Sequence, residues 1–179
     1  MKGKLVAGVK RRTMNGYILV MELGKGQEIS VGGLGRGYFP RGFYVYCGSV
    51  PSGRRSRKGK KTRWHIDYLA GKAEIQEVII CETEESLECL LSPALSKELT
   101  HIPGFGSSDC HCRSHLFFCA DREMMMERLS VFLARLGLTP QSHSVAPRSL
   151  WSCIREGWLT YPGSSGKLNK EDAGRLSRD

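Results

Sequence analysis

The residues best suited to chemistry lie between Gly42 and Leu69, where the strand-like run GFYVYCGS is followed by RRSRKGKKTR and then by WHIDYL. The middle run holds seven cations in ten residues, and Asp67 is the first carboxylate after it. Such a run repels itself and favours a polyanionic partner, although many charge runs are simply solvated loops. We expect nucleic-acid contacts from its cations, which are Arg54, Arg55, Arg57, Lys58, Lys60, Lys61 and Arg63.

WHIDYL adds an imidazole and a carboxylate, His65 and Asp67. On a helix, residues two apart are roughly 200° apart around the axis, so the pair is not expected to interact directly there. His65 could donate to a phosphate or carry a proton near neutral pH. Alternatively, both residues satisfy backbone groups while the apolar neighbours pack in the core, and for Asp67 we favour this structural role.

A second cluster of reactive side chains has the pattern DCxCxxH, formed by Asp109, Cys110, Cys112 and His115. These donor types suit zinc, and a metal-stabilised structural domain is one hypothesis for the chain. The Cys-x-Cys spacing is tighter than the usual Cys-x-x-Cys, and no second pair completes four thiolates. A buried turn in which Asp109 and Ser107 bond backbone amides is the favoured alternative.

The elements that must position these residues are mainly strands and two helices. Alternation places Tyr44 and Tyr46 on the same strand face. Thr83 is predicted to cap a helix with Glu84 and Glu85 in its first turn, and Pro93 to kink or end that helix. Trp151 and Ile154 could belong to one short packed element, together with Trp158 and Leu159. The predicted strands are 16–23, 42–49, 74–82 and 115–120, with a glycine-rich strand in 26–40, and the second helix is 121–136.

Composition limits the class of protein. The length of 179 residues suits one main core, and the net charge of +9 favours an acidic partner. Seven scattered cysteines fit a reducing compartment better than a disulfide framework. The sequence has neither a long apolar run nor a secretory leader, so we expect a cytoplasmic protein with no membrane partner. Its oligomeric state is left open.

Five separated motifs are Gly16-Tyr17-Ile18, Tyr46-Cys47-Gly48-Ser49, WHIDYL, Glu88-Cys89 and FGSSDCHCRSHLFF. Their order resembles the GIY-YIG nuclease superfamily, in particular the small predicted-endonuclease subfamily that is sometimes fused to endonuclease III. The resemblance covers residues 13–119 and implies an α+β fold with a small mixed central sheet flanked by helices, in a domain over 13–120. Beyond this domain, the sequence pattern predicts a helix over 121–137 that packs on it and a weakly structured, helical C-terminal extension over 138–179.

The same resemblance implies a DNA endonuclease whose site combines Tyr17, Tyr46, a helix arginine and Glu88, with Mg²⁺ or Mn²⁺ held by Glu88. In relatives the arginine comes from a helix after the second tyrosine motif. Only fourteen residues separate Ser49 from Trp64 here, so that helix is shortened or lost. Arg54, Arg55 or Arg57 would have to replace the arginine. The alternative is a catalytically impaired module that binds DNA or another nucleic acid.

Overall fold

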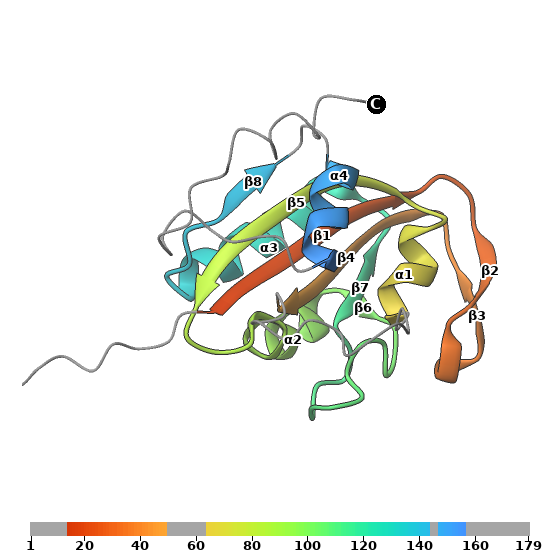
Figure 1. The fold of residues 1–179 in the computed structure, drawn as a ribbon, viewed down its shortest axis with the longest axis horizontal. Coiled ribbons are helices and arrows are strands. Elements are labelled where there is room, and N and C mark those ends of the chain that lie inside the picture. Colours follow the sequence, from red (N-terminus) through yellow and green to blue (C-terminus); the bar gives the residue numbers. More distant parts are fainter. Residues whose placement is uncertain (1–13, 50–63, 144–146, 157–179) are drawn as a thin grey trace, which may run out of the picture.

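A computed structural model describes residues 14–49, 64–143 and 147–156. Its centre is a six-stranded sheet with the strand order β6-β7-β4-β1-β5-β8 (Figure 1). A separate ribbon pairs β2 (Gln27–Ser30) with β3 (Arg36–Phe39). The sheet strands are β1 (Met14–Leu23), β4 (Gly42–Ser49), β5 (Glu74–Thr83), β6 (Thr100–His101), β7 (Leu116–Cys119) and β8 (Gln141–His143).

The strand pairings confirm the α+β class but correct the predicted mixed sheet. Each pairing between described strands is antiparallel. Both β4 and β5 run antiparallel to β1 and therefore run parallel to each other. Because β1 lies between them, the two parallel strands never become hydrogen-bonded neighbours.

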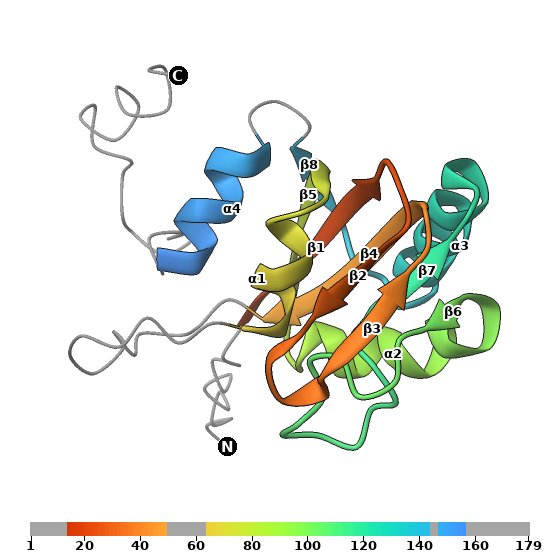
Figure 2. The ribbon, with the colours of Figure 1, turned by 90° about the vertical axis from the view of Figure 1, so that its right-hand side faces the viewer.

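Two layers cover the sheet, and the alternation of β1 shows why. Tyr17, Leu19 and Met21 face one layer, whereas Ile18 and Val20 face the other. The first layer includes α1 (His65–Ala70) and α4 (Pro147–Glu156), and the second includes α2 (Leu87–Glu98) and α3 (Arg122–Arg135). Figure 2 shows the two helix pairs on opposite sides of the strands.

The start of α2 differs from the sequence prediction. Thr83 is the last residue of β5, where it pairs with β1, and its hydroxyl donates to the carbonyl of Glu85. The helix begins at Leu87, so Glu88 becomes the acidic residue of its first turn. Sheet pairing therefore overrides the local capping signal at Thr83. Pro93 lies inside the helix instead of ending it.

The second predicted helix is confirmed as α3. The Asp121 carboxylate caps it by accepting from the Met124 amide at 2.9 Å, and Gly137 follows its end with φ of 66°. Met125 and Leu129 are at most 1% exposed and belong to the core, whereas Met124 of the same helix is 43% exposed.

Two elements of the predicted C-terminal extension pack against the sheet. β8 pairs with β5, and α4 buries Trp151 and Ile154 in the α1 layer. This confirms a packed element around those two residues, while Trp158 and Leu159 lie outside the described residues. None of the helices in the described ranges is long and apolar enough to cross a membrane.

Candidate active site: a polar pocket at the end of the sheet

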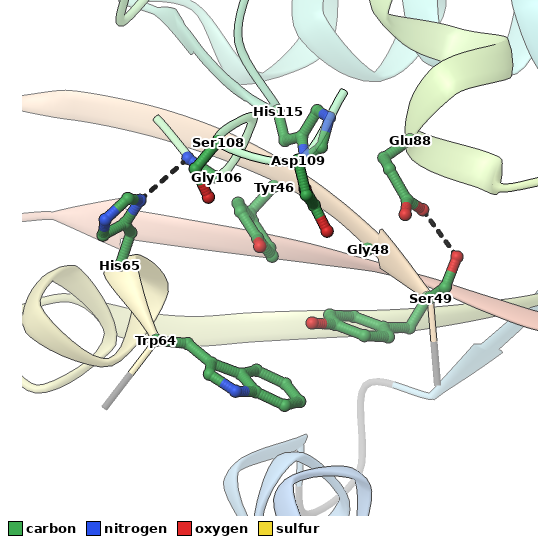
Figure 3. A pocket seen from close by; sticks show the side chains of 11 residues that line it. Tyr46, Gly48, Ser49, Trp64, His65, Glu88, Gly106, Ser108, Asp109 and His115 are labelled. Carbon is green, nitrogen blue, oxygen red and sulfur yellow. Dashed lines mark hydrogen bonds between the residues drawn. The ribbon is translucent and has the colours of Figure 1, made fainter. Parts of the chain in front are cut away.

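A pocket of about 360 Å³ opens where β4 ends. Its walls come from β1, β4, the start of α1, the first turn of α2 and the loop between β6 and β7. The pocket brings together four residues that the sequence singled out from separate motifs: Tyr17, Tyr46, His65 and Glu88. In Figure 3, Tyr46 lies between His65 and Glu88.

Glycines make room for the two pocket tyrosines. A Cβ at Gly48 would lie 2.5 Å from the Tyr17 hydroxyl, and one at Gly106 would lie 3.0 Å from the Tyr46 ring. Gly106 also has φ of 76°, a conformation that favours glycine. The rings of Tyr17 and Tyr46 lie 6.2 Å apart between centroids. The absence of side chains at Gly48 and Gly106 therefore leaves the space in which both tyrosines line one pocket.

The phenols of Tyr17 and Tyr46 are neutral at physiological pH. Burial raises the pKa of both above the ordinary value of 10.0, and the Glu88 carboxylate raises them further. The neighbouring Tyr46 also raises the pKa of Tyr17. A neutral phenol can donate one hydrogen bond and accept another. The arrangement therefore suits positioning of water or substrate better than proton abstraction by a phenolate.

Tyr44 shares the strand face of Tyr46 but has a structural role. Its hydroxyl donates to the Pro40 carbonyl at 2.7 Å, and its ring packs 5.1 Å from that of Phe118. It does not line the pocket. Only Tyr46 lines the pocket, because it lies closer than Tyr44 to the end of β4 at which the pocket opens.

Glu88 reaches the pocket around the end of β4 from the opposite helix layer. Its Oε2 accepts a hydrogen bond from the Ser49 hydroxyl at 2.7 Å. Gly16 allows the approach, because a Cβ there would lie 2.4 Å from the Leu87 Cβ. The glycine of the first tyrosine motif thus sets how closely α2 packs on β1, and hence where Glu88 lies.

His65 opens α1 and faces the pocket from the other end. Its Nδ1 accepts a hydrogen bond from the Gly106 amide at 3.1 Å. Because a backbone N–H can only donate, neutral His65 carries its proton on Nε2. His65 therefore satisfies a backbone group, as the structural alternative predicted, and its role toward a phosphate stays a prediction.

Asp67 is structural, as favoured from the sequence. It accepts from the Trp64 amide at 2.7 Å, and its two oxygens accept from Arg155 Nε and Nη2 at 2.7 and 2.6 Å. The Arg155 guanidinium also lies 4.1 Å from the Trp64 ring centroid. This contact between α4 and α1 fixes the segment that begins with His65. No local pattern predicts this contact, because 88 positions separate Asp67 from Arg155.

The basic run lies outside the described residues. This applies to Arg54, Arg55, Arg57, Lys58, Lys60, Lys61 and Arg63, and so to the predicted replacement arginine. The nearest described residues on either side are Ser49 and Trp64, and both line the pocket. The chain therefore leaves the pocket wall immediately before this segment and rejoins the wall immediately after it.

The cysteine cluster adjoins the pocket and contains Cys89 in place of the predicted Asp109. Cys110, Cys112 and His115 lie with Cys89 so that their ligand atoms are within 4.8 Å of one another. Burial raises the pKa of Cys89 to about 12, with further contributions from Cys112 and Cys110. Burial also lowers the pKa of His115, which lines the pocket. Among the described residues, backbone amides do not donate the predicted hydrogen bonds to the side chains of Ser107 and Asp109.

Several pocket residues were not assigned to the site from the sequence. The sequence could have indicated them, because each lies in or beside a motif that was already recognised. Asp109 is the most relevant, since it adds a second carboxylate, and Ser49 holds Glu88. The others are Gly48, Trp64, Gly106, Ser108 and His115.

These features define an antiparallel α+β domain with an aromatic and acidic pocket at one end of its sheet. Residues 16–138 match the family model described as "Domain of unknown function DUF123". The chain therefore belongs to the DUF123 family. Neither the curated proteins nor the solved structures include one that matches it.

Proposed function

We propose that this chain is a nuclease of the GIY-YIG superfamily, from the subfamily sometimes fused to endonuclease III, and that it hydrolyses phosphodiester bonds in DNA. The observation that carries the proposal is the pocket itself. It unites Tyr17, Tyr46, His65 and Glu88, which are distant in sequence and are the residues that the resemblance and the chemistry selected. Tyr44, an equally buried tyrosine on the same strand face, is excluded from it.

The donor atoms of the pocket fit the Mg²⁺ or Mn²⁺ that such a reaction would use. Glu88 and Asp109 both line the pocket, and carboxylate oxygens are the ligands that these hard cations prefer. Bound there, the cation would neutralise charge that develops on the phosphate. Glu88 is the primary ligand in this proposal, because Ser49 fixes the orientation of its carboxylate.

The other pocket residues position the reactants. His65 can donate a hydrogen bond from Nε2–H to a phosphate oxygen, since Nδ1 is occupied by Gly106. Tyr46, as a neutral phenol, can donate to one oxygen and accept from the attacking water. The 360 Å³ pocket is large enough for a phosphate and its sugar but not for a duplex. The scissile group would therefore enter it while the rest of the DNA lies outside.

Charge supplies the contact with the remainder of the DNA. The run that contains Lys58, Lys60, Lys61 and Arg63 belongs to the sequence between Ser49 and Trp64, and both of these flanking residues line the pocket. Each phosphate neutralised by a lysine or arginine releases a counterion, so binding should weaken steeply as salt increases.

A supercoiled-plasmid nicking assay with Mg²⁺ or Mn²⁺ tests the proposal. We expect Glu88→Gln to lower the rate by about 100-fold or more and Tyr46→Phe by at least about tenfold. Glu82→Gln and Tyr44→Phe are the matched controls, because these residues lie outside the pocket, and both should retain the wild-type rate. Equal activity in all five proteins would identify a contaminating nuclease and refute the proposal.

The shortened segment between Ser49 and Trp64 favours a second candidate, a nucleic-acid-binding module without catalysis. It predicts salt-sensitive binding of labelled DNA with no cleavage under any divalent metal. The two candidates separate cleanly when binding and nicking are measured on the same preparation. A Glu88→Gln protein that binds like wild type while wild type alone cleaves would exclude the binding-only candidate.

A further inference from the structure

We propose that Cys89, Cys110, Cys112 and His115 form a structural zinc site that joins the first turn of α2 to the loop between β6 and β7. The four ligand atoms, one from each residue, lie within 4.8 Å of one another. The closest contact is 3.2 Å, between the Cys110 Sγ and the His115 Nε2. Three ligands come from the loop, and the fourth comes from the helix.

The separations match what a single zinc ion needs. With Zn–S bonds of about 2.3 Å and Zn–N bonds of about 2.0 Å, tetrahedral ligands lie roughly 3.5 to 3.8 Å apart. Ligand atoms that are already within 4.8 Å can reach these positions through small side-chain rotations. A disulfide would need a sulfur–sulfur distance of about 2.05 Å and would use only two of the three thiols.

The chemistry of the set selects zinc and a closed site. Three thiolates and an imidazole are soft or borderline donors, in contrast to the carboxylates that line the neighbouring pocket. A Cys₃His set fills all four tetrahedral positions and leaves none for a substrate. The site would therefore be structural, and its zinc would be a different ion from the Mg²⁺ or Mn²⁺ proposed at Glu88.

The loop that supplies three ligands is long enough to require an interaction that orders it. Residues 102–115 contain no helix or strand, and uninterrupted loops of this length are uncommon in compact domains unless something orders them. Backbone bonds already fold the loop back on itself, because the Gly104 amide donates to Arg113 O and the His115 amide donates to Phe105 O, both at 2.8 Å. The Ser92 hydroxyl ties α2 to the same loop through Ser114 O at 2.9 Å.

A zinc ion here would also fix one wall of the pocket. Glu88 precedes Cys89, and Asp109 precedes Cys110, so each pocket carboxylate is adjacent in sequence to a proposed ligand. The inference is nevertheless independent of the proposed nuclease activity, because metal content and spectroscopy test it without any substrate.

The first experiment measures metal content of the full-length protein, purified without a metal-affinity tag after reconstitution with zinc. We expect about one tightly bound zinc per chain in wild type, and below about 0.2 in Cys89→Ser and Cys112→Ser. Cys153→Ser, on α4, is the matched control and should retain the wild-type content. Absence of zinc from wild type, or full zinc in Cys89→Ser, would overturn the site.

Cobalt substitution of the wild-type protein covers the case in which a variant fails to fold. Tetrahedral Co²⁺ with three thiolates should give intense visible bands and a near-ultraviolet charge-transfer band whose intensity corresponds to three sulfur ligands, and zinc should displace it. Weak octahedral bands, or the intensity of fewer than three thiolates, would contradict the assignment. Mass spectrometry of the purified protein, alkylated under denaturing and non-reducing conditions, should find Cys89, Cys110 and Cys112 all alkylated, whereas a disulfide among them in the purified protein would refute the site.

Discussion

The two faces of the central sheet are both buried, yet they differ in what they contribute. The face under α2 and α3 is mainly aliphatic, with Ile18, Val20 and Val45 packed against helix leucines. The face under α1 and α4 is rich in aromatic rings, and two of its tyrosines direct hydroxyls into the pocket. Aliphatic packing supplies stability alone, whereas tyrosine packing can also place a polar atom at the end of the sheet.

The faces meet at one point, the bond between Ser49 and Glu88. Glu88 belongs to the helix layer on the aliphatic side but lines a pocket whose other prominent side chains come from the aromatic side. The comparison therefore predicts that the aliphatic face tolerates changes without loss of site chemistry, except at the start of α2.

The largest expected effect is on stability, from a core truncation in the aliphatic face. Leu129→Ala should lower the free energy of unfolding by about 2 to 5 kcal/mol, because Leu129 is 1% exposed and a cavity would remain. Leu136→Ala, 42% exposed, should cost less than about 0.5 kcal/mol. Urea denaturation gives both values. The nicking rate per folded molecule should be unchanged. A loss of nicking by folded Leu129→Ala would contradict the proposal that the aliphatic face contributes stability alone.

The next effect comes from the ion pair that fixes α4 on α1. Arg155→Ala should destabilise the fold by about 1 to 3 kcal/mol, since the Arg155 and Asp67 side chains are only 23% and 17% exposed. Arg122→Ala, which removes a more exposed pair with Glu77, should cost about 0.5 kcal/mol or less. Thermal and urea unfolding compare the two. Similar losses would mean that the Arg155 contact does not distinguish the aromatic face.

Alkaline pH should weaken the fold in part through two buried tyrosines of the aromatic face. The pKa values of Tyr17 and Tyr46 are raised on folding, so above pH 10 the unfolded chain loses phenolic protons that the folded chain keeps. Stability contributed by neutral phenols is complete below pH 10 and should fall by about 1.4 kcal/mol per pH unit for each tyrosine above it. Unfolding curves as a function of pH measure this slope. A slope unchanged in Tyr17→Phe would contradict the assignment to that residue.

The smallest expected effect is the difference in stability between variants of Tyr44 and Tyr46, the two tyrosines of β4. Tyr44→Phe loses the hydrogen bond to Pro40 and should cost about 1 kcal/mol of stability. Tyr46→Phe should change stability less, while it alone should affect chemistry in the pocket. Denaturation and nicking rates measured on both proteins give the contrast. The reverse result, with Tyr44→Phe inactive, would place the site elsewhere on β4.

Local patterns were sufficient for much of the fold. Alternation in 42–49 predicted which residues share a face, and the periodicity of 121–136 predicted α3. The error at Thr83 shows the limit of such patterns. A threonine followed by two glutamates is a good helix start in isolation, but pairing with β1 keeps Thr83 in the strand.

The sequence by itself determined the kinds of side chain available, their motifs and the alternation of the strands, because these follow from neighbouring residues. Tertiary structure alone decided that Glu88 meets Ser49, that Cys89 joins the cysteine cluster and that Arg155 pairs with Asp67. Each of these contacts joins residues more than twenty positions apart. No local periodicity encodes such contacts, since they depend on how the folded chain packs distant elements together, as where Gly16 allows α2 to approach β1.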